Sequence, residues 1–327
     1  MKVLVIGASG HIGNAIVRLL LKRKHGVTAC GRRKKPPANL SGLRVHYRAG
    51  DAEAPGQFDK WVAGHDLVVD AAAPYPAGVF SPASETQGDS LVRAEMRTRR
   101  LLDAVSRHET RLAYIGSCVT LARPRTAVQQ FQMKLMRIAH PYFHVKELIE
   151  ARIVDASRRG IRAVIVDPTY CLGPWDLRAR KYCTIPLLLG GEIPGSISQP
   201  LHVIDVRDVA AALLSALDGE RYGEPILLSA YKMPTHDLYS LICEVAGVPP
   251  PRISIATEPV LAGAYLLEAM LSVAGLESPL SSGAIMISTA FDYLEPAGEL
   301  EELGVKPHPL EQTIVDSIKW YRRIGYC

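Results

Sequence analysis

The chain has 327 residues, of which 48% are apolar and 22% are charged, and its formal net charge is +5. These ordinary values exclude a disordered or fibrous protein, and such a small positive excess does not indicate a nucleic-acid-binding face. No apolar run reaches the roughly 18 residues that a membrane span needs, so we expect a cytoplasmic protein without nucleic-acid partners or stable membrane insertion.

The cysteines give no sign of a structural metal or a disulfide framework. They stand far apart, at positions 30, 118, 171, 183, 243 and 327, with no CxxC pair and no matching histidine spacing. This pattern predicts reduced thiols and no metal site.

Strand and helix patterns alternate through the first half of the chain. Short apolar runs predict strands at residues 2–6, 27–30, 44–47, 67–70, 111–115 and 162–166. Helical spacing predicts helices at about 12–21, 84–107 and 142–159, with a basic, glutamine-rich loop at 123–139. Strands buried on both faces that alternate with helices are typical of an α/β fold, here a Rossmann-type doubly wound parallel sheet.

Proline and glycine become frequent after Pro168, although strands are still expected at residues 201–206 and 225–229. We therefore predict a Rossmann domain over residues 1–170, to which residues 200–224 return, and a smaller C-terminal substrate-binding lobe over residues 171–327. An apolar segment at 260–274 predicts a core or pocket-lining helix, with membrane contact as the alternative.

A glycine-rich loop joins the first predicted strand to the first predicted helix. Gly7, Gly10 and Gly13 form a GxxGxxG pattern there. The first glycine permits the tight turn, the second lets backbone N–H groups approach a pyrophosphate, and the third lets the helix pack on the strand. The loop therefore predicts a dinucleotide site that includes Ser9, His11 and Ile12; a simple connecting turn is the alternative.

The end of the second predicted strand is basic, because Arg32 and Arg33 stand where an NAD site would place an acidic residue. Guanidinium groups bind a 2′-phosphate in bidentate fashion, so NADP is favoured over NAD. A solvated basic turn would explain the same residues. Asp51, after the third predicted strand, is a candidate for the adenine amino group or else a solvated turn residue.

The pair Tyr142 and Lys146 is the only YxxxK match in the chain. Residues at i and i+4 share a helix face, so the ammonium can stabilise the ionised phenol and lower the tyrosine pKa. Ser117 ends a predicted strand at the sheet edge where α/β folds bind ligands, and its hydroxyl can hold a carbonyl oxygen. Cys118 beside it is interpreted as a buried structural cysteine rather than a nucleophile.

With these features in this order, the sequence resembles the extended short-chain dehydrogenase/reductase (SDR) family, also described as NAD-dependent epimerase/dehydratase-like. The segments from Asp167 to Pro174 and from Leu201 to Ala210 resemble two further family motifs. Within the family, the chain is most similar to the dihydroflavonol-4-reductase, 3β-hydroxysteroid-dehydrogenase and hopanoid-associated sugar epimerase subgroups. Two departures are Ala94, where many relatives have asparagine, and Asp167, where the family usually has arginine.

The resemblance implies hydride transfer between a nicotinamide and a carbonyl carbon. Tyr142 would donate the proton, Lys146 would also anchor the nicotinamide ribose, and Ser117 would position the carbonyl oxygen. It also places Ala71, Ala72 and Pro168 at the cofactor.

Three functions are compatible with these features. The first is an NADPH-dependent reductase of a ketone or aldehyde on a fairly apolar small molecule. The second is a nucleotide-sugar epimerase or dehydratase with retained NAD, in which a basic group would bind the diphosphate: Arg178, Arg180 and Lys181. The third is a non-catalytic dinucleotide-binding regulator. A homodimer is a possible assembly for any of them.

Overall fold

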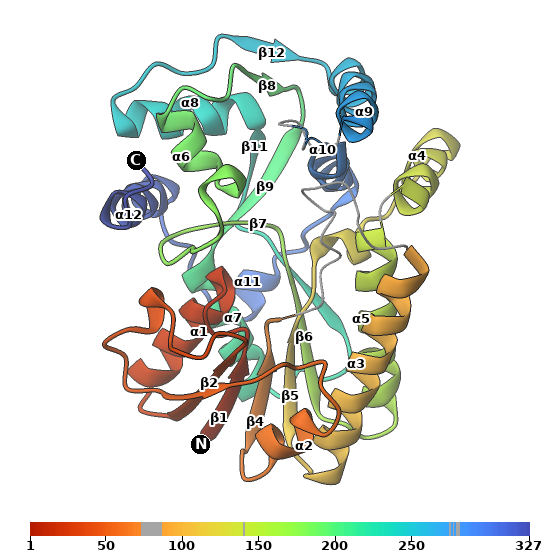
Figure 1. Cartoon of the computed structure of the whole chain (residues 1–327), viewed down its shortest axis with the longest axis vertical. Coiled ribbons are helices and arrows are strands. Elements are labelled where there is room, and N and C mark those ends of the chain that lie inside the picture. Colours follow the sequence, from red (N-terminus) through yellow and green to blue (C-terminus); the bar gives the residue numbers. More distant parts are fainter. Residues whose placement is uncertain (73–86, 140, 275, 277, 279–281) are drawn as a thin grey trace.

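The computed structural model describes residues 1–72, 87–139, 141–274, 276, 278 and 282–327. A seven-stranded sheet forms its centre, with the strand order β10-β6-β5-β4-β1-β2-β3 (Figure 1). Every neighbouring pair in this sheet is parallel. The chain runs outward from β1 to one side and then to the other, so the predicted Rossmann-type doubly wound fold is confirmed. The strands are β1 Lys2–Ile6, β2 Gly26–Gly31, β3 His46–Ala49, β4 Leu67–Asp70, β5 Arg111–Ile115, β6 Ala163–Pro168 and β10 Pro225–Leu228.

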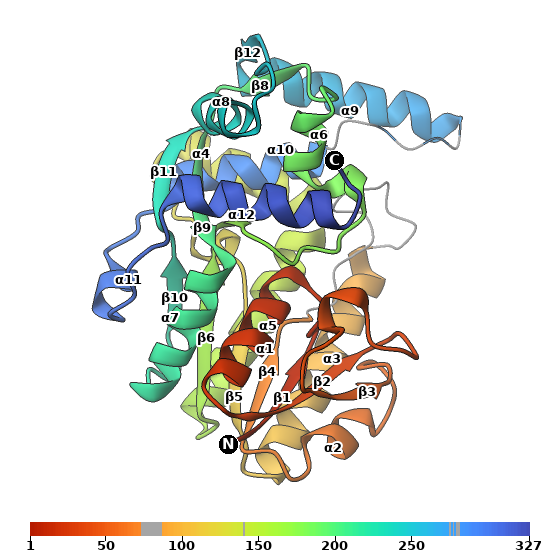
Figure 2. The same cartoon turned by 90° about the vertical axis from the view of Figure 1, so that its left-hand side faces the viewer.

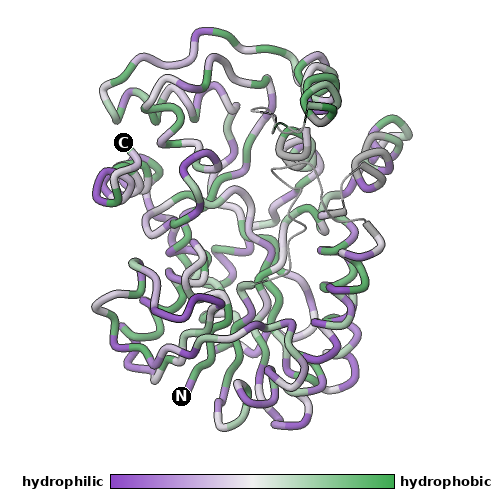
Figure 3. Tube along the Cα trace, viewed as in Figure 1, coloured by the Kyte–Doolittle hydropathy of each residue, from purple (hydrophilic) through white to green (hydrophobic). Residues whose placement is uncertain are grey.

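Helices cover both faces of this sheet because its apolar strands bury both sets of alternating side chains. Val3 and Val5 of β1 point to the face covered by α1 (His11–Lys22) and α7 (Val206–Asp218). Leu4 and Ile6 point to the opposite face, which is covered by α2, α3 and α5. These three helices span Gln57–Val62, Gln87–Arg107 and Pro141–Arg158. Figure 3 shows the hydrophobic residues concentrated in the central strands.

Two small sheets and a third apolar core lie beyond the large sheet, at the end opposite to the N-terminus (Figures 1 and 2). The strand orders are β11-β9-β7 and β12-β8. The segment 200–224 was predicted to return to the Rossmann domain. The next strand in the chain, β10, belongs to the large sheet of that domain. The division at residue 170 stays a prediction. The strands are β7 Tyr170–Leu172, β8 Gly195–Ile197, β9 Pro200–Asp205, β11 Tyr231–Pro234 and β12 Ile253–Ile255, and the helices are α6 Thr184–Leu189, α8 Thr235–Ala246, α9 Thr257–Val273, α10 Ser282–Thr289, α11 Glu299–Glu302 and α12 Leu310–Arg323.

Two predicted elements differ from the structure by a shift of both ends by two residues or in their type, at β3 and at α4. β3 begins two residues later than expected, and the predicted loop at 123–139 contains α4 (Ala127–Ala139). The start of α4 is a capping box: the Thr126 hydroxyl accepts from the Gln129 backbone N–H at 3.2 Å, and the Gln129 side chain accepts from the Thr126 backbone N–H at 3.1 Å. This exchange satisfies two backbone donors at the helix start. For the predicted helix at 84–107, residues 84–86 lie outside the described residues.

The apolar segment 260–274 forms a helix, α9, but its outer face is not part of a core. Leu266, Met270 and Val273 are exposed. The helix packs against α10, with Ala264 buried, so the core interpretation is wrong for the outer face. Among the described residues, no helix is both long and apolar enough to cross a membrane.

Candidate active site and cofactor-binding loop

The glycine loop has the geometry that its sequence predicts. Gly7 has a φ of +79°, which side chains disfavour, and a Cβ atom there would lie 2.6 Å from the Ala71 carbonyl oxygen. A Cβ atom on Gly13 would lie 2.2 Å from the Gly7 carbonyl oxygen. Glycine is therefore required at both positions, and Ala71 and Ala72 border the turn. This close backbone cradle before the N-terminus of α1 fits a dinucleotide pyrophosphate.

Three side chains brace the loop from outside. The His11 Nε2–H donates to the Gly173 carbonyl oxygen at 3.1 Å, and burial lowers the pKa of His11, which favours its neutral form. Asn39, which sequence reasoning missed, donates to the carbonyl oxygens of Ser9 at 2.9 Å and Trp175 at 3.1 Å. Ile12 packs against the sheet core. His11 and Ile12 thus have structural contacts besides the predicted role at the cofactor.

A buried ion pair holds the end of β4 next to this loop. The Arg97 guanidinium donates two hydrogen bonds to the Asp70 carboxylate, at 2.7 and 2.8 Å, and both side chains are at most 2% exposed. Asp70 also accepts from the Ala72 backbone N–H at 3.3 Å. Sequence analysis missed this pair. The sequence feature that could have indicated the buried pair is Asp70, a charged residue at the end of an apolar strand.

The residues predicted to make the protein prefer NADP over NAD lie at the end of β2. Arg32 and Arg33 are exposed, and within the described residues neither guanidinium has a hydrogen-bonded or ionic partner. Asp51 accepts from the Glu53 backbone N–H at 3.0 Å, as in an ordinary turn. This contact supports the solvated-turn interpretation of Asp51. The two exposed arginines can still bind an anion.

The structure brings the three predicted catalytic residues together at the carboxyl end of β5. The Tyr142 hydroxyl donates to Ser117 Oγ at 3.0 Å, and both residues are 8% exposed. Lys146 lies one turn further along α5, is 1% exposed, and donates to the Gly116 carbonyl oxygen at 3.3 Å. The two hydroxyls converge where a carbonyl oxygen can accept from both, with an ammonium group behind them.

Two buried carboxyl groups lie behind this cluster. Asp167 ends the apolar part of β6 next to Pro168, and Glu150 follows Lys146 by one turn of α5. Burial raises the pKa of Glu150 and raises that of Asp167 well above its usual range. Sequence analysis noted Asp167 only as a departure from the family pattern, and it missed Glu150, whose i+4 spacing from Lys146 was the available signal. The structure places Pro168 at the end of β6, paired with Leu228 of β10.

Other candidate groups are occupied elsewhere. Arg178 pairs with the buried Asp176 at 2.7 Å, and Arg180 bonds the Tyr326 carbonyl oxygen at 2.8 Å, so both already have partners within the chain. Burial raises the pKa of the Cys118 thiol, as expected for a structural cysteine. Among the described residues, no group of three or more His, Cys, Asp or Glu side chains could hold a metal ion.

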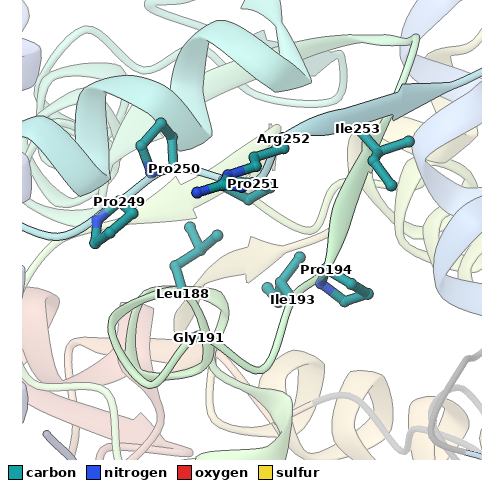
Figure 4. Close-up of a pocket in the computed structure, with 9 residues that line it drawn as sticks. All are labelled: Leu188, Gly191, Ile193, Pro194, Pro249, Pro250, Pro251, Arg252 and Ile253. Atoms are coloured by element: carbon teal, nitrogen blue, oxygen red, sulfur yellow. The ribbon is translucent and has the colours of Figure 1, made fainter.

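A cavity of about 310 Å³ lies away from these residues, between the end of α6 and the loop before β12. Figure 4 shows Leu188, Ile193 and the proline run 249–251 around it. None of the predicted catalytic or cofactor residues lines it.

Residues 3–227 match the model of the NAD-dependent epimerase/dehydratase family. The chain belongs to this family. The match covers the glycine loop and the cluster of Ser117, Tyr142 and Lys146, so the protein is an NAD(P)-dependent enzyme of the extended SDR type.

Comparison with individual members of the family gives two kinds of relative. The chain is 24% identical to a putative dihydroflavonol 4-reductase from Synechocystis sp., over 98% of this chain and 95% of the relative. It is also 24% identical to sterol demethylase protein B from Methylococcus capsulatus, over 99% of both chains. A nucleoside-diphosphate-sugar epimerase structure from Pseudomonas aeruginosa has a TM-score of 0.74 at 22% identity, covering 100% of this chain and 99% of the other. The structural likeness shows a shared fold.

Proposed function

We propose that the protein is an NADPH-dependent reductase of a ketone or aldehyde group on a fairly apolar small molecule. The observation that carries the proposal is the 3.0 Å contact between the Tyr142 and Ser117 hydroxyls beside the buried Lys146. Support for an apolar substrate comes from the names of the two relatives, a putative dihydroflavonol 4-reductase and a sterol demethylase protein.

In this reaction the bound nicotinamide supplies the hydride. Ser117 donates a hydrogen bond to the substrate carbonyl oxygen and orients it, and Tyr142 gives its proton to the alkoxide oxygen as that oxygen gains charge. A tyrosine has an ordinary pKa near 10, so losing this proton at neutral pH needs a nearby positive charge. The Lys146 ammonium, on the same face of α5, supplies it.

The cofactor would be held by the Gly7–Gly13 loop, by Ala71, Ala72 and Lys146, and by the basic end of β2. The close backbone approach at Gly7 and Gly13 fits a pyrophosphate, and the free guanidinium groups of Arg32 and Arg33 fit a 2′-phosphate. We infer NADP rather than NAD from these two arginines.

Arg32→Ala should raise the Kd for NADPH about 10- to 100-fold and leave the Kd for NADH nearly unchanged, since hydrogen bonds to a charged group contribute about 1.5–3 kcal/mol. Titration of nicotinamide fluorescence measures both constants. Arg44→Ala, which removes another exposed arginine, is the matched control. Equal weakening of both cofactors by Arg32→Ala would show that Arg32 does not bind a 2′-phosphate.

A nucleotide-sugar epimerase is the second candidate, favoured by the structural likeness to a nucleoside-diphosphate-sugar epimerase. Arg178, one of the groups proposed for its diphosphate, is paired with Asp176 and would have to bind the diphosphate with its remaining N–H groups. The two functions differ in how the cofactor is held. Tight, exchangeable NADPH on the purified protein supports the reductase, whereas NAD that co-purifies and resists exchange supports the epimerase.

A further inference from the structure

The buried carboxyl groups of Glu150 and Asp167 have no part in the reaction described above. Asp167 is fully buried, and Glu150 is 9% exposed. The two carboxyl groups lie close enough for each to shift the pKa of the other. The sheet fixes the position of Asp167 beside the end of β5. Ile115 pairs with Val166, so the residues after β5 lie directly beside Asp167. A Cβ atom on Gly116 would lie 1.8 Å from Asp167 Oδ1, so only glycine permits this approach.

The hydrogen bonds around the pair indicate a proton between them. Glu150 accepts from the Thr120 hydroxyl at 2.7 Å. No donor among the described residues meets hydrogen-bond geometry with either oxygen of Asp167. A buried, ionised carboxylate without a donor is costly, and one proton on the pair lets one carboxyl group donate to the other.

The groups that surround the pair leave this proton in place. Lys146 from α5 and Arg123 after β5 favour ionised carboxylates, but burial and the mutual repulsion of two charges oppose them and raise the pKa of Asp167. The Cys118 thiol, whose pKa burial also raises, adds no charge at neutral pH.

With one proton, the net charge of the Glu150 and Asp167 pair is equal and opposite to that of the buried Lys146. Lys146 is 1% exposed, and a buried ammonium group is costly unless an opposite charge lies near it. One proton on the pair leaves a charge of −1 against the +1 of Lys146, whereas two ionised carboxylates would leave an excess negative charge behind Tyr142. We propose that Glu150 and Asp167 share one proton at neutral pH and that their single negative charge holds Lys146 in position beside Tyr142. They are positioning residues, and the role of Lys146 in this inference rests on the proposed function.

The proton can be observed without any substrate. At pH 7 the infrared spectrum should contain the C=O stretching band of a buried, protonated carboxyl group, and both Asp167→Asn and Glu150→Gln should remove it. Either amide can donate to the remaining carboxylate, so both variants keep the charge of the pair and are expected to fold. Asp205→Asn is the control, because Asp205 is buried but its pKa is lowered by Arg207. A band that persists in both Asp167→Asn and Glu150→Gln would overturn the proposal, whatever reaction the enzyme performs.

The pH dependence of stability gives a second test. A carboxyl group that is protonated in the folded protein and ionised in the unfolded chain binds more protons when folded. Its contribution to stability is therefore lost as pH rises from the unfolded pKa, about 4, through the raised folded pKa. Relative to Asp167→Asn, the wild-type free energy of unfolding should fall between pH 5 and 8 in urea titrations. A difference that stays constant over this range would contradict the shared proton.

The effect on Lys146 is tested by removing both charges. Glu150→Gln/Asp167→Asn leaves the ammonium without its counter-charge, and the Kd for NADPH should rise about tenfold or more, the equivalent of one hydrogen bond to a charged group. Each single variant keeps one negative charge and should weaken binding less. A double variant that binds no worse than the single variants would overturn the positioning role and leave the shared proton standing.

Discussion

Tyr142→Phe should lower turnover of an identified carbonyl substrate by about 10²- to 10⁴-fold, the usual contribution of a positioned proton donor. The variant removes the hydroxyl that meets Ser117 Oγ at 3.0 Å and leaves the ring in the apolar core that surrounds it. The loss should therefore appear in kcat, with the Kd for the cofactor nearly unchanged. Steady-state kinetics and a fluorescence titration measure the two quantities separately.

The matched control is Tyr231→Phe, which removes a tyrosine hydroxyl that donates to the His308 carbonyl oxygen. It should change kcat far less than Tyr142→Phe does. If Tyr142→Phe keeps wild-type turnover, the proposed proton transfer is wrong, and the cluster of Ser117, Tyr142 and Lys146 would then serve binding alone.

Breaking the ion pair between Asp70 and Arg97 should destabilise the fold by about 3–5 kcal/mol, because either single substitution leaves a buried charge without its partner. Asp70→Leu strands the guanidinium, and Arg97→Met strands the carboxylate. Both side chains are at most 2% exposed, so water cannot replace the missing partner. Urea unfolding monitored by circular dichroism measures the change.

The double variant Asp70→Leu/Arg97→Met supplies the decisive comparison. With both charges removed, its loss of stability should be well below the sum of the two single losses, since apolar replacements of a buried pair are often nearly neutral. Additive losses would show that the two side chains act independently. Asp70 also accepts a hydrogen bond from the Ala72 backbone N–H, and this bond is lost whenever Asp70 is replaced. The double variant should therefore remain less stable than the wild type by the contribution of that hydrogen bond.

The sequence predicts the large sheet well because its strands are apolar runs with clear glycine and helix boundaries. It also predicts the cluster of Ser117, Tyr142 and Lys146, since a strand end and one helix turn fix their positions. The capping box at Thr126 and Gln129 was present in the sequence, but the basic, glutamine-rich composition led to a loop prediction.

Contacts between distant segments could not be predicted in the same way. Asn39 reaches Trp175 across 136 residues of chain, and Asp70 meets Arg97 through the packing of α3 on the sheet. Such contacts depend on the position of each helix on the sheet. The spacing of residues along the sequence does not determine that position. In α9 the sequence led to a wrong expectation for the same reason. Its hydrophobicity suggested burial, but the outer face of the helix is exposed.

The pairing of β10 with β6 has a consequence for synthesis of the chain. Pro225 is opposite Ile165 in this pair, so the apolar strand β6 gains its partner on this side, the edge strand β10, only after residue 225 has been made. A chain that stops before this point leaves β6 with a row of unpaired backbone N–H and C=O groups, which can pair with strands of other chains. Shortened forms that end before β10 should therefore aggregate, even though they contain the whole glycine loop and the Ser117, Tyr142 and Lys146 cluster.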